Sequence, residues 1–168
     1  MPEIAEVALT AEILHCQLKG KVLRKFRFVD GRYKRDPPDD LRSFRRALPL
    51  TIKSVKSKGK FLWFHLVGEE DWYLWNTFGL TGGWTFREDS RYIKCEMVTD
   101  EQTVFYYDQR NFGTFKISQD KKELERKLKT LTPDLLKEDF DFRKVTQYEK
   151  PIVSILMDQK KAGSGKIG

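Results

Sequence analysis

Cysteine, histidine and long apolar runs are scarce in this chain of 168 residues, which contains two cysteines and two histidines. Cys16, Cys95, His15 and His65 match no zinc-ligand spacing, so we expect no metal site within the chain. No apolar run approaches the roughly 18 residues of a membrane span, and the N-terminus lacks the basic-then-apolar layout of a secretory signal. We therefore expect no membrane partner, a reducing intracellular environment, and free thiols rather than a disulfide.

Acidic residues are too few to balance the basic ones, and the formal net charge is +7. The imbalance is concentrated in residues 1–60, where 15 Lys and Arg stand against 7 Asp and Glu, a local excess of +8. Such an excess indicates an anionic partner, although a solvated basic surface has the same composition. Aromatic residues and arginines interleaved with the lysines, as in KSKGKFLWF and YYDQRNFGTF, favour a nucleic acid as that partner.

The pattern of apolar residues changes along the chain. Hydrophobic and aromatic fractions of 39% and 13% predict a packed globular protein. Apolar residues spaced alternately by three and four predict an amphipathic helix over residues 3–18, ended by Gly20. From residue 21, stretches rich in aromatic and β-branched residues, such as VLRKFRF and TVFYYD, predict short antiparallel strands. TDEQ predicts a hairpin turn, and RDPPDD predicts a loop before a short helix, DLRSFRRAL.

The expected fold is α+β, with the N-terminal helix packed on an antiparallel β-sandwich or flattened barrel. After Ile117 the composition becomes helical in KKELERKLKTL and again in FDFRKVTQYEKPIVSILMDQKK. We therefore expect a β-sandwich domain at 1–118, a linker at 119–135 and the start of a helical domain at 136–168. The final AGSGKIG has the composition of a turn, so the last domain looks cut short.

The second residue, Pro2, has a candidate chemical role. Methionine aminopeptidases remove Met1 when the next side chain is small, which leaves the secondary amine of Pro2 at the chain terminus. An α-amino group has a pKa of about 7.7–8.0, against about 10.4 for lysine, so it is more readily deprotonated for attack on a carbonyl carbon. The product is an iminium, an electron sink that permits β-elimination at a damaged nucleotide. Alternatively, Pro2 is simply a favourable first residue of a helix.

Two carboxylates follow this amine closely in the sequence. Glu3 is placed to act as acid and base in turn, protonating the sugar ring oxygen and later moving protons. Its structural alternative is a favourable interaction with the helix N-terminus, worth roughly 0.3–1 kcal/mol. Glu6, one helical turn further, has the same two interpretations, and the structural one is favoured.

Several motifs follow one another along the chain: MPEIAEV, KGKFLWF, FGLTGGW, YDQRNFGTF, LTPDLL and ILMDQKKAGSG. In this order they resemble motifs of the formamidopyrimidine-DNA glycosylase and endonuclease VIII family. The first resembles Met-Pro-Glu-x-Pro-Glu-Val, with Ala5 in place of the second proline. The next three resemble a hairpin with a DNA-contacting lysine, a Gly-(Met/Leu)-(Ser/Thr)-Gly loop and an Asp-x-Arg-x-Phe-Gly loop. The last two resemble the inter-domain linker and the start of a helix–two-turn–helix segment.

The resemblance implies catalytic roles for three residues. Pro2 would be the nucleophile, Glu3 the acid and base, and Lys60 the hairpin lysine that contacts the lesion strand. Without the resemblance, Lys60 is expected to be a solvated cation. Glu6 would be one of the DNA-binding residues.

The resemblance also implies that Leu80, Arg110 and Phe112 fill the space left by an extruded base, with Arg110 facing the orphaned partner base. Taken alone, Leu80 and Phe112 are expected in the core, although Gly113 after Phe112 suits an exposed loop tip. Asn111 stands where many family members have a second arginine, which removes one expected phosphate contact.

The implied function is that of a bifunctional DNA glycosylase and AP lyase of base excision repair, a monomer that acts on damaged double-stranded DNA without a cofactor. The family's Gly-x-Gly-Asn turn, second helix and zinc or zincless finger would lie beyond Gly168. The sequence WNTFGLTGGW leans toward the endonuclease VIII branch, which the family associates with oxidised pyrimidines. Two alternatives stay open, a non-catalytic damaged-DNA-binding module and a basic β-rich RNA binder.

Overall fold

The computed structural model describes residues 2–88, 91–131, 134 and 151. The predicted start of a helix–two-turn–helix domain at 136–168 therefore lies outside the described residues, apart from Pro151. The helices are α1 (Ile4–Leu18), α2 (Arg32–Arg35), α3 (Leu41–Ala47) and α4 (Lys121–Thr130). The strands are β1 (Val22–Phe28), β2 (Leu50–Lys58), β3 (Phe61–Val67), β4 (Asp71–Thr77), β5 (Gly82–Thr85), β6 (Ile93–Thr99), β7 (Thr103–Asp108) and β8 (Thr114–Ser118).

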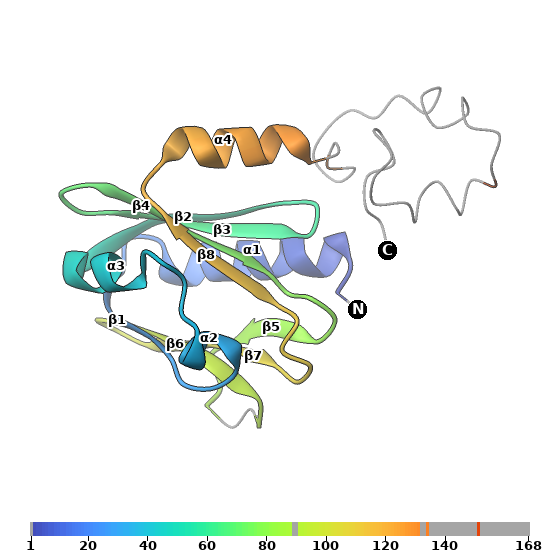
Figure 1. Ribbon diagram of the computed structural model, residues 1–168, viewed down its shortest axis with the longest axis horizontal. Helices are drawn as coiled ribbons and strands as arrows, with labels where there is room; N and C mark the ends of the chain where they lie inside the picture. Colours follow the sequence, from blue (N-terminus) through green and yellow to red (C-terminus); the bar gives the residue numbers. More distant parts are fainter. Residues whose placement is uncertain (1, 89–90, 132–133, 135–150, 152–168) are drawn as a thin grey trace.

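The eight strands form one antiparallel sheet in the order β5-β7-β6-β1-β2-β3-β4-β8. Strands β1 and β2, at the centre of this order, are joined through the pairs Val22↔Thr51 and Leu23↔Leu50 alone. Such a short junction lets the sheet fold over, and Figure 1 shows β2, β3, β4 and β8 in one layer and β1, β5, β6 and β7 in the other. The expected α+β fold, a helix on an antiparallel β-sandwich, is confirmed.

Helix α1 runs antiparallel to β2. Near the end of the helix, the N–H of Gly20 donates to the carbonyl of Ile52 at 2.8 Å, and earlier in the helix Nδ1 of His15 accepts from the N–H of Val55 at 3.2 Å. The N-terminus of α1 therefore lies toward the C-terminal end of β2. The apolar stripe predicted for this helix is buried, namely Ile4, Val7, Ala11, Leu14 and Leu18.

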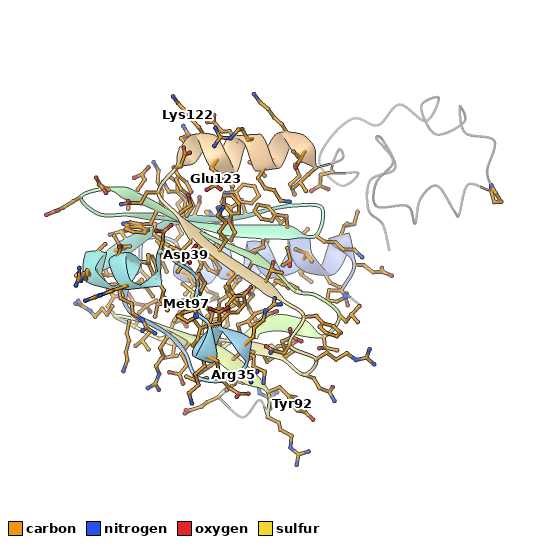
Figure 2. The ribbon with its side chains drawn as sticks, in the orientation of Figure 1. Arg35, Asp39, Tyr92, Met97, Lys122 and Glu123 are labelled. Atoms are coloured by element: carbon orange, nitrogen blue, oxygen red, sulfur yellow. The ribbon has the colours of Figure 1, made fainter. Side chains whose placement is uncertain are left out.

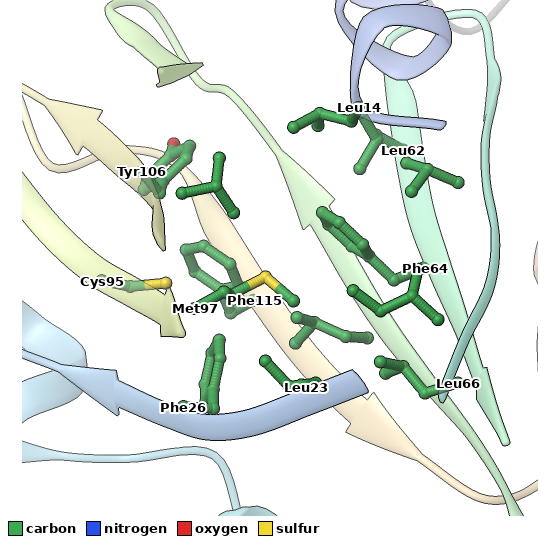
Figure 3. Close-up of a cluster of buried hydrophobic side chains, with 14 of the residues drawn as sticks. Leu14, Leu23, Phe26, Leu62, Phe64, Leu66, Cys95, Met97, Tyr106 and Phe115 are labelled. Atoms are coloured by element: carbon green, nitrogen blue, oxygen red, sulfur yellow. The ribbon is translucent and has the colours of Figure 1, made fainter. Parts of the chain in front are cut away.

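The main core lies between the two layers and α1, as Figure 3 shows. Burying this much aliphatic and aromatic surface is the main favourable contribution to folding. Side chains come from both layers and from the helix, including Leu14 of α1, Leu23 and Phe26 of β1, Leu62, Phe64 and Leu66 of β3, Met97 of β6, Tyr106 of β7 and Phe115 of β8.

A second cluster explains why β3 and β4 are almost continuously apolar. Their alternate residues face away from the core and are covered by α4, which lies on the outer face of this layer (Figure 1). Within α4, Leu124 is buried on this cluster, and Figure 2 shows Glu123 directed toward the sheet and Lys122 directed away from it. The other buried members of this outer cluster are Phe61, Trp63, Tyr73 and Trp75.

Most of the local predictions are confirmed, and one element was not foreseen. The TDEQ turn joins β6 to β7, which pair from Val98↔Thr103 onward, and the short helix after RDPPDD is α3. Helix α2 lies where no helix was expected, because its sequence RYKR has no apolar periodicity. Helix α4 occupies much of the expected linker 119–135, and the domain division itself stays a prediction.

Both cysteines are free thiols, as expected, with Cys16 exposed and Cys95 buried. Burial raises the pKa of the Cys95 thiol well above its ordinary value. In the described part of the chain, no helix is long and apolar enough to cross a membrane. The same residues contain no group of three or more His, Cys, Asp and Glu side chains arranged to hold a metal ion.

Candidate active site

Pro2 and Glu3 precede the first turn of α1. The helix begins at Ile4, and its N-cap Glu3 has extended backbone angles of φ −91° and ψ 170°. The carboxylate of Glu6 accepts a hydrogen bond from the N–H of Glu3 at 2.8 Å, so Glu6 has the structural role that the sequence favoured. Pro2 lies outside the helix, half-buried, and is not its first residue. The helical explanation for this proline therefore does not apply.

Lys60 lies in the turn between β2 and β3, whose last paired residues are Lys58 and Phe61. Gly59 in this turn has φ +55°, a left-handed conformation that glycine adopts without strain. Its N–H donates to the carboxylate of Asp134 at 3.2 Å, and Asp134 is 3% exposed. The ammonium nitrogen of Lys60 is buried. Lys60 is thus not the solvated cation that its sequence context alone suggests.

Leu80, Arg110 and Phe112 lie in two loops, which connect β4 to β5 (residues 78–81) and β7 to β8 (residues 109–113). Phe112 is 56% exposed, so the expectation that it packs in the core is wrong. Arg110 is exposed and Leu80 is half-buried. An exposed phenylalanine beside an exposed arginine is a combination suited to contacting bases of a nucleic acid.

The two loops are in backbone contact. Gly79 has φ +64°, and a Cβ atom at this position would lie 2.7 Å from the nitrogen of Gly113, so only glycine fits. On the other side of this contact, Asn111 has φ +58°, which asparagine tolerates better than most residues. The sharp turn at Asn111 comes directly before Phe112 and brings the chain back toward Gly79.

Asp108, the last residue of β7, is 1% exposed and bonds to both loops. Its Oδ1 accepts a hydrogen bond from Oγ1 of Thr81 at 2.6 Å, and its Oδ2 accepts one from the N–H of Gly113 at 2.7 Å. Oγ1 of Thr81 in turn accepts from the N–H of Arg110 at 2.9 Å. The guanidinium of Arg32 in α2 donates to the carbonyl of Gly113. The loops are therefore cross-linked by hydrogen bonds on both sides of Phe112.

Tyr106 supports both loops from the core. Its hydroxyl donates to the carbonyl of Phe78 at 3.4 Å, and a Cβ atom added to Gly82 or Gly113 would overlap the same hydroxyl. Burial, together with the nearby negative charge of Asp108, raises the pKa of the Tyr106 phenol. The hydroxyl therefore stays protonated and remains a donor at physiological pH.

The register of the strands brings the predicted site residues to one end of the sandwich. Phe61 pairs with Thr77, and Thr77 pairs with Thr114, so these three residues form one row across β3, β4 and β8. The Lys60 turn and both loops are directly adjacent to this row in the sequence. Because α1 is antiparallel to β2, Pro2 lies toward the same end. Figure 1 shows the N-terminus, the β2–β3 turn and the loop after β4 at this end of the molecule.

Four residues that support the site received no role from the sequence. Asp108 and Asp134 each stand inside a recognised motif, YDQRNFGTF and LTPDLL, so their positions carried a signal that was not used. Thr81 likewise lies inside FGLTGGW. Arg32 gave no signal, because its contact with Gly113 joins segments 81 residues apart.

Comparison with known sequences identifies relatives over nearly the whole chain. The family model of the formamidopyrimidine-DNA glycosylase N-terminal domain matches residues 1–115. The formamidopyrimidine-DNA glycosylase of Thermus thermophilus is 32% identical over 174 residues, which cover 99% of this chain and 61% of that protein. The protein of the same name from Bacillus licheniformis is 27% identical over 173 residues, covering 95% and 61%. The chain thus spans 61% of the length of these curated relatives.

Comparison with solved structures agrees. The crystal structure of the MutM (Fpg) protein from Thermus thermophilus matches with a TM-score of 0.73 and 28% identity, covering 96% of this chain and 59% of that one. A structure of MutM in complex with carbocyclic 8-oxo-G containing DNA matches with a TM-score of 0.77 at 21% identity, covering 96% and 64%, and supports the fold. With a matching family model over more than half of its length, the chain belongs to the formamidopyrimidine-DNA glycosylase family.

Proposed function

We propose that this chain is the catalytic N-terminal portion of a bifunctional DNA glycosylase and AP lyase of base excision repair. Family membership supports a part in removing damaged bases from DNA. The observation that carries the proposal is the arrangement at one end of the sandwich, where the Pro2 segment lies outside α1 and toward the same end as the Lys60 turn and the loop of the exposed Phe112.

In the proposed reaction, the Pro2 nitrogen, freed by removal of Met1, attacks C1′ of the damaged nucleotide. A bond forms between this nitrogen and C1′, the bond from C1′ to the base breaks, and the base leaves with the proton that the nitrogen gives up. Glu3 protonates the sugar ring oxygen as the ring opens to the iminium. The ionised Glu3 then removes a C2′ proton, which expels the 3′ phosphate by β-elimination, and water hydrolyses the iminium to restore the amine.

The exposed loops have a separate role in this proposal. Extruding a base costs a few kcal/mol of stacking and pairing, and side chains that occupy the vacancy offset part of this cost. Phe112 and Leu80 supply apolar surface for the vacancy, and Arg110 supplies hydrogen-bond donors to the orphaned base. Lys60 would contact the lesion strand from the β2–β3 turn, where its ammonium nitrogen is buried.

The preferred lesion belongs to the proposal as well. The relatives carry the name formamidopyrimidine-DNA glycosylase, and one solved relative holds carbocyclic 8-oxo-G containing DNA. These names favour oxidised purines, whereas the sequence around Leu80 leans toward oxidised pyrimidines. Duplexes with one lesion of each kind, compared under the same conditions, would decide between the two.

Borohydride trapping on abasic DNA tests the proposed chemistry, because borohydride reduces an iminium to a stable amine. We expect a covalent adduct that maps to the tryptic peptide of residues 2–19. The matched control is Pro2→Leu, since a bulky second residue blocks removal of Met1 and keeps the amine away from position 2. Trapping at an equal rate in this control, or an adduct on another peptide, would exclude Pro2 as the nucleophile. Salt-sensitive DNA binding without any adduct would instead favour the non-catalytic damaged-DNA-binding module.

A further inference from the structure

Asp108 is a buried carboxylate whose two oxygens are divided between the two loops. It is 1% exposed, and it accepts from Thr81 at 2.6 Å and from the N–H of Gly113 at 2.7 Å. A buried charge is costly unless it is fully hydrogen-bonded, and hydrogen bonds to an ionised acceptor are stronger than neutral ones. The two hydrogen bonds therefore offset the cost of burying the Asp108 carboxylate, and they link Thr81 to Gly113, which are distant in sequence.

The linkage holds the backbone on both sides of Phe112. On one side, the N–H of Arg110 donates to Oγ1 of Thr81 at 2.9 Å. On the other side, Gly113 is held at its N–H by Asp108 and at its carbonyl by Arg32. The Phe112 side chain between Arg110 and Gly113 is 56% exposed. The hydrogen bonds therefore hold the backbone of an apolar residue that packs mostly outside the core.

We propose that Asp108 is a positioning residue that joins the Leu80 loop and the Arg110–Phe112 loop into one rigid unit. This inference rests on the proposed function, in which both loops enter the space of an extruded base. Two loops that are already joined lose little conformational entropy when they enter the DNA. Two independent loops would each lose conformational entropy on binding, which would weaken the affinity. Asp108 would thus act on DNA binding through the loops and without touching the DNA.

Thr81→Val is the main test, because valine keeps the shape of threonine and removes only the hydroxyl. Without it, Oδ1 of Asp108 and the N–H of Arg110 each lose their bond to Thr81. Asp108→Asn is the conservative variant, since its amide can still accept from Gly113 and donate to Thr81. The matched control is Thr99→Val. Thr99 is 6% exposed and bonds to Gln102 in the β6–β7 turn, in a different part of the sheet.

One measurement needs no DNA. Trypsin cleavage after Arg110 in the folded protein, followed by mass spectrometry, reports opening of the Phe112 loop. We expect Thr81→Val, which removes two hydrogen bonds, to raise the rate at this bond by at least roughly fivefold. Asp108→Asn should raise it less, and Thr99→Val should leave it unchanged. A rise at all tryptic sites together would indicate global unfolding and would overturn the inference.

The second measurement uses a duplex with a tetrahydrofuran abasic analogue opposite 2-aminopurine, whose fluorescence reports the surroundings of the orphaned base. Thr81→Val, which lacks both hydrogen bonds of the hydroxyl, should bind at least roughly fivefold more weakly and give a smaller fluorescence change at saturation. Thr99→Val should behave like the wild type, and Asp108→Asn should fall between. If Thr81→Val matches Thr99→Val in both assays, or if the wild type gives no fluorescence response, the inference is wrong.

The two proposals can fail separately. A wild-type protein that gives no borohydride adduct, while Thr81→Val shows faster cleavage and a smaller fluorescence change, would remove the proposed chemistry and leave the positioning role of Asp108 standing. An adduct that forms at the same rate in all variants, with unchanged fluorescence and cleavage, would leave the chemistry standing and remove the positioning role.

Discussion

Phe112→Ala should leave the fold almost as stable as the wild type. Phe112 is 56% exposed, so 44% of it is covered. Because complete burial of a phenylalanine side chain is worth roughly 2.5 kcal/mol, truncation here should lower the free energy of unfolding by at most about 1 kcal/mol. The matched control is Phe115, which is 7% exposed and packs edge-to-face on Tyr33 and Tyr106. Phe115→Ala should cost about 3–5 kcal/mol.

The same substitution should weaken binding to a duplex with an abasic analogue by roughly 1–3 kcal/mol, the range for loss of an aromatic stacking contact with a base. Urea unfolding followed by tryptophan fluorescence gives the stability of both variants, and fluorescence anisotropy gives the affinity of Phe112→Ala. The reasoning is refuted if Phe112→Ala unfolds as readily as Phe115→Ala, because the side chain would then belong to the core. It is refuted equally if Phe112→Ala binds the abasic duplex as tightly as the wild type.

Glu3→Gln should slow base release more than nicking at a pre-formed abasic site, which has already lost its base; equal losses in both assays would remove the separate acid role. A hydrogen bond from Lys116 lowers the pKa of Glu123 below its ordinary 4.5, so its stabilising contribution is fully present above about pH 4.5 and is lost as the pH falls through the lowered value. Glu123→Gln should flatten this part of the pH dependence of the unfolding free energy. A protein extended to the relatives' full length should bind duplex DNA more tightly and with a steeper salt dependence, by about 0.9 in log K per log salt for each added phosphate contact; equal slopes would contradict this.

The elements that the sequence predicted are those whose burial follows a local period. The stripe of α1 repeats every three or four residues, and β2 alternates between buried and exposed positions, so each pattern can be recognised without knowing the partner. The almost continuous apolar run of β3 lacks such a period, because its burial depends on a distant segment, α4. Leu62 and Phe64 face the core while Phe61 and Trp63 face α4, so both sides of the strand are buried.

The features that the sequence did not predict are contacts between distant segments. Asp108 stands in a string of polar residues and looks exposed, yet Thr81, 27 residues earlier, covers one of its oxygens. Lys60 likewise looks solvated, but the turn that carries it is bonded to Asp134, 75 residues from Gly59. A local pattern cannot reveal such pairs, because they form only after the sheet brings the ends of different strands together.

The arrangement of the candidate site depends on the strand register, and α4 helps to fix that register although it lies on the opposite face of the layer from the core. A one-residue slip of β3 against β4 would exchange the faces of every side chain on the slipped strand. Trp63 and Trp75, which pair across these strands, would then no longer both face α4. Because both faces are buried, such a slip would expose or misplace large apolar groups on either side. The packing of Leu124 on this outer face therefore favours the register that sets Phe61 opposite Thr77 and so aligns the Lys60 turn with the loop after β4.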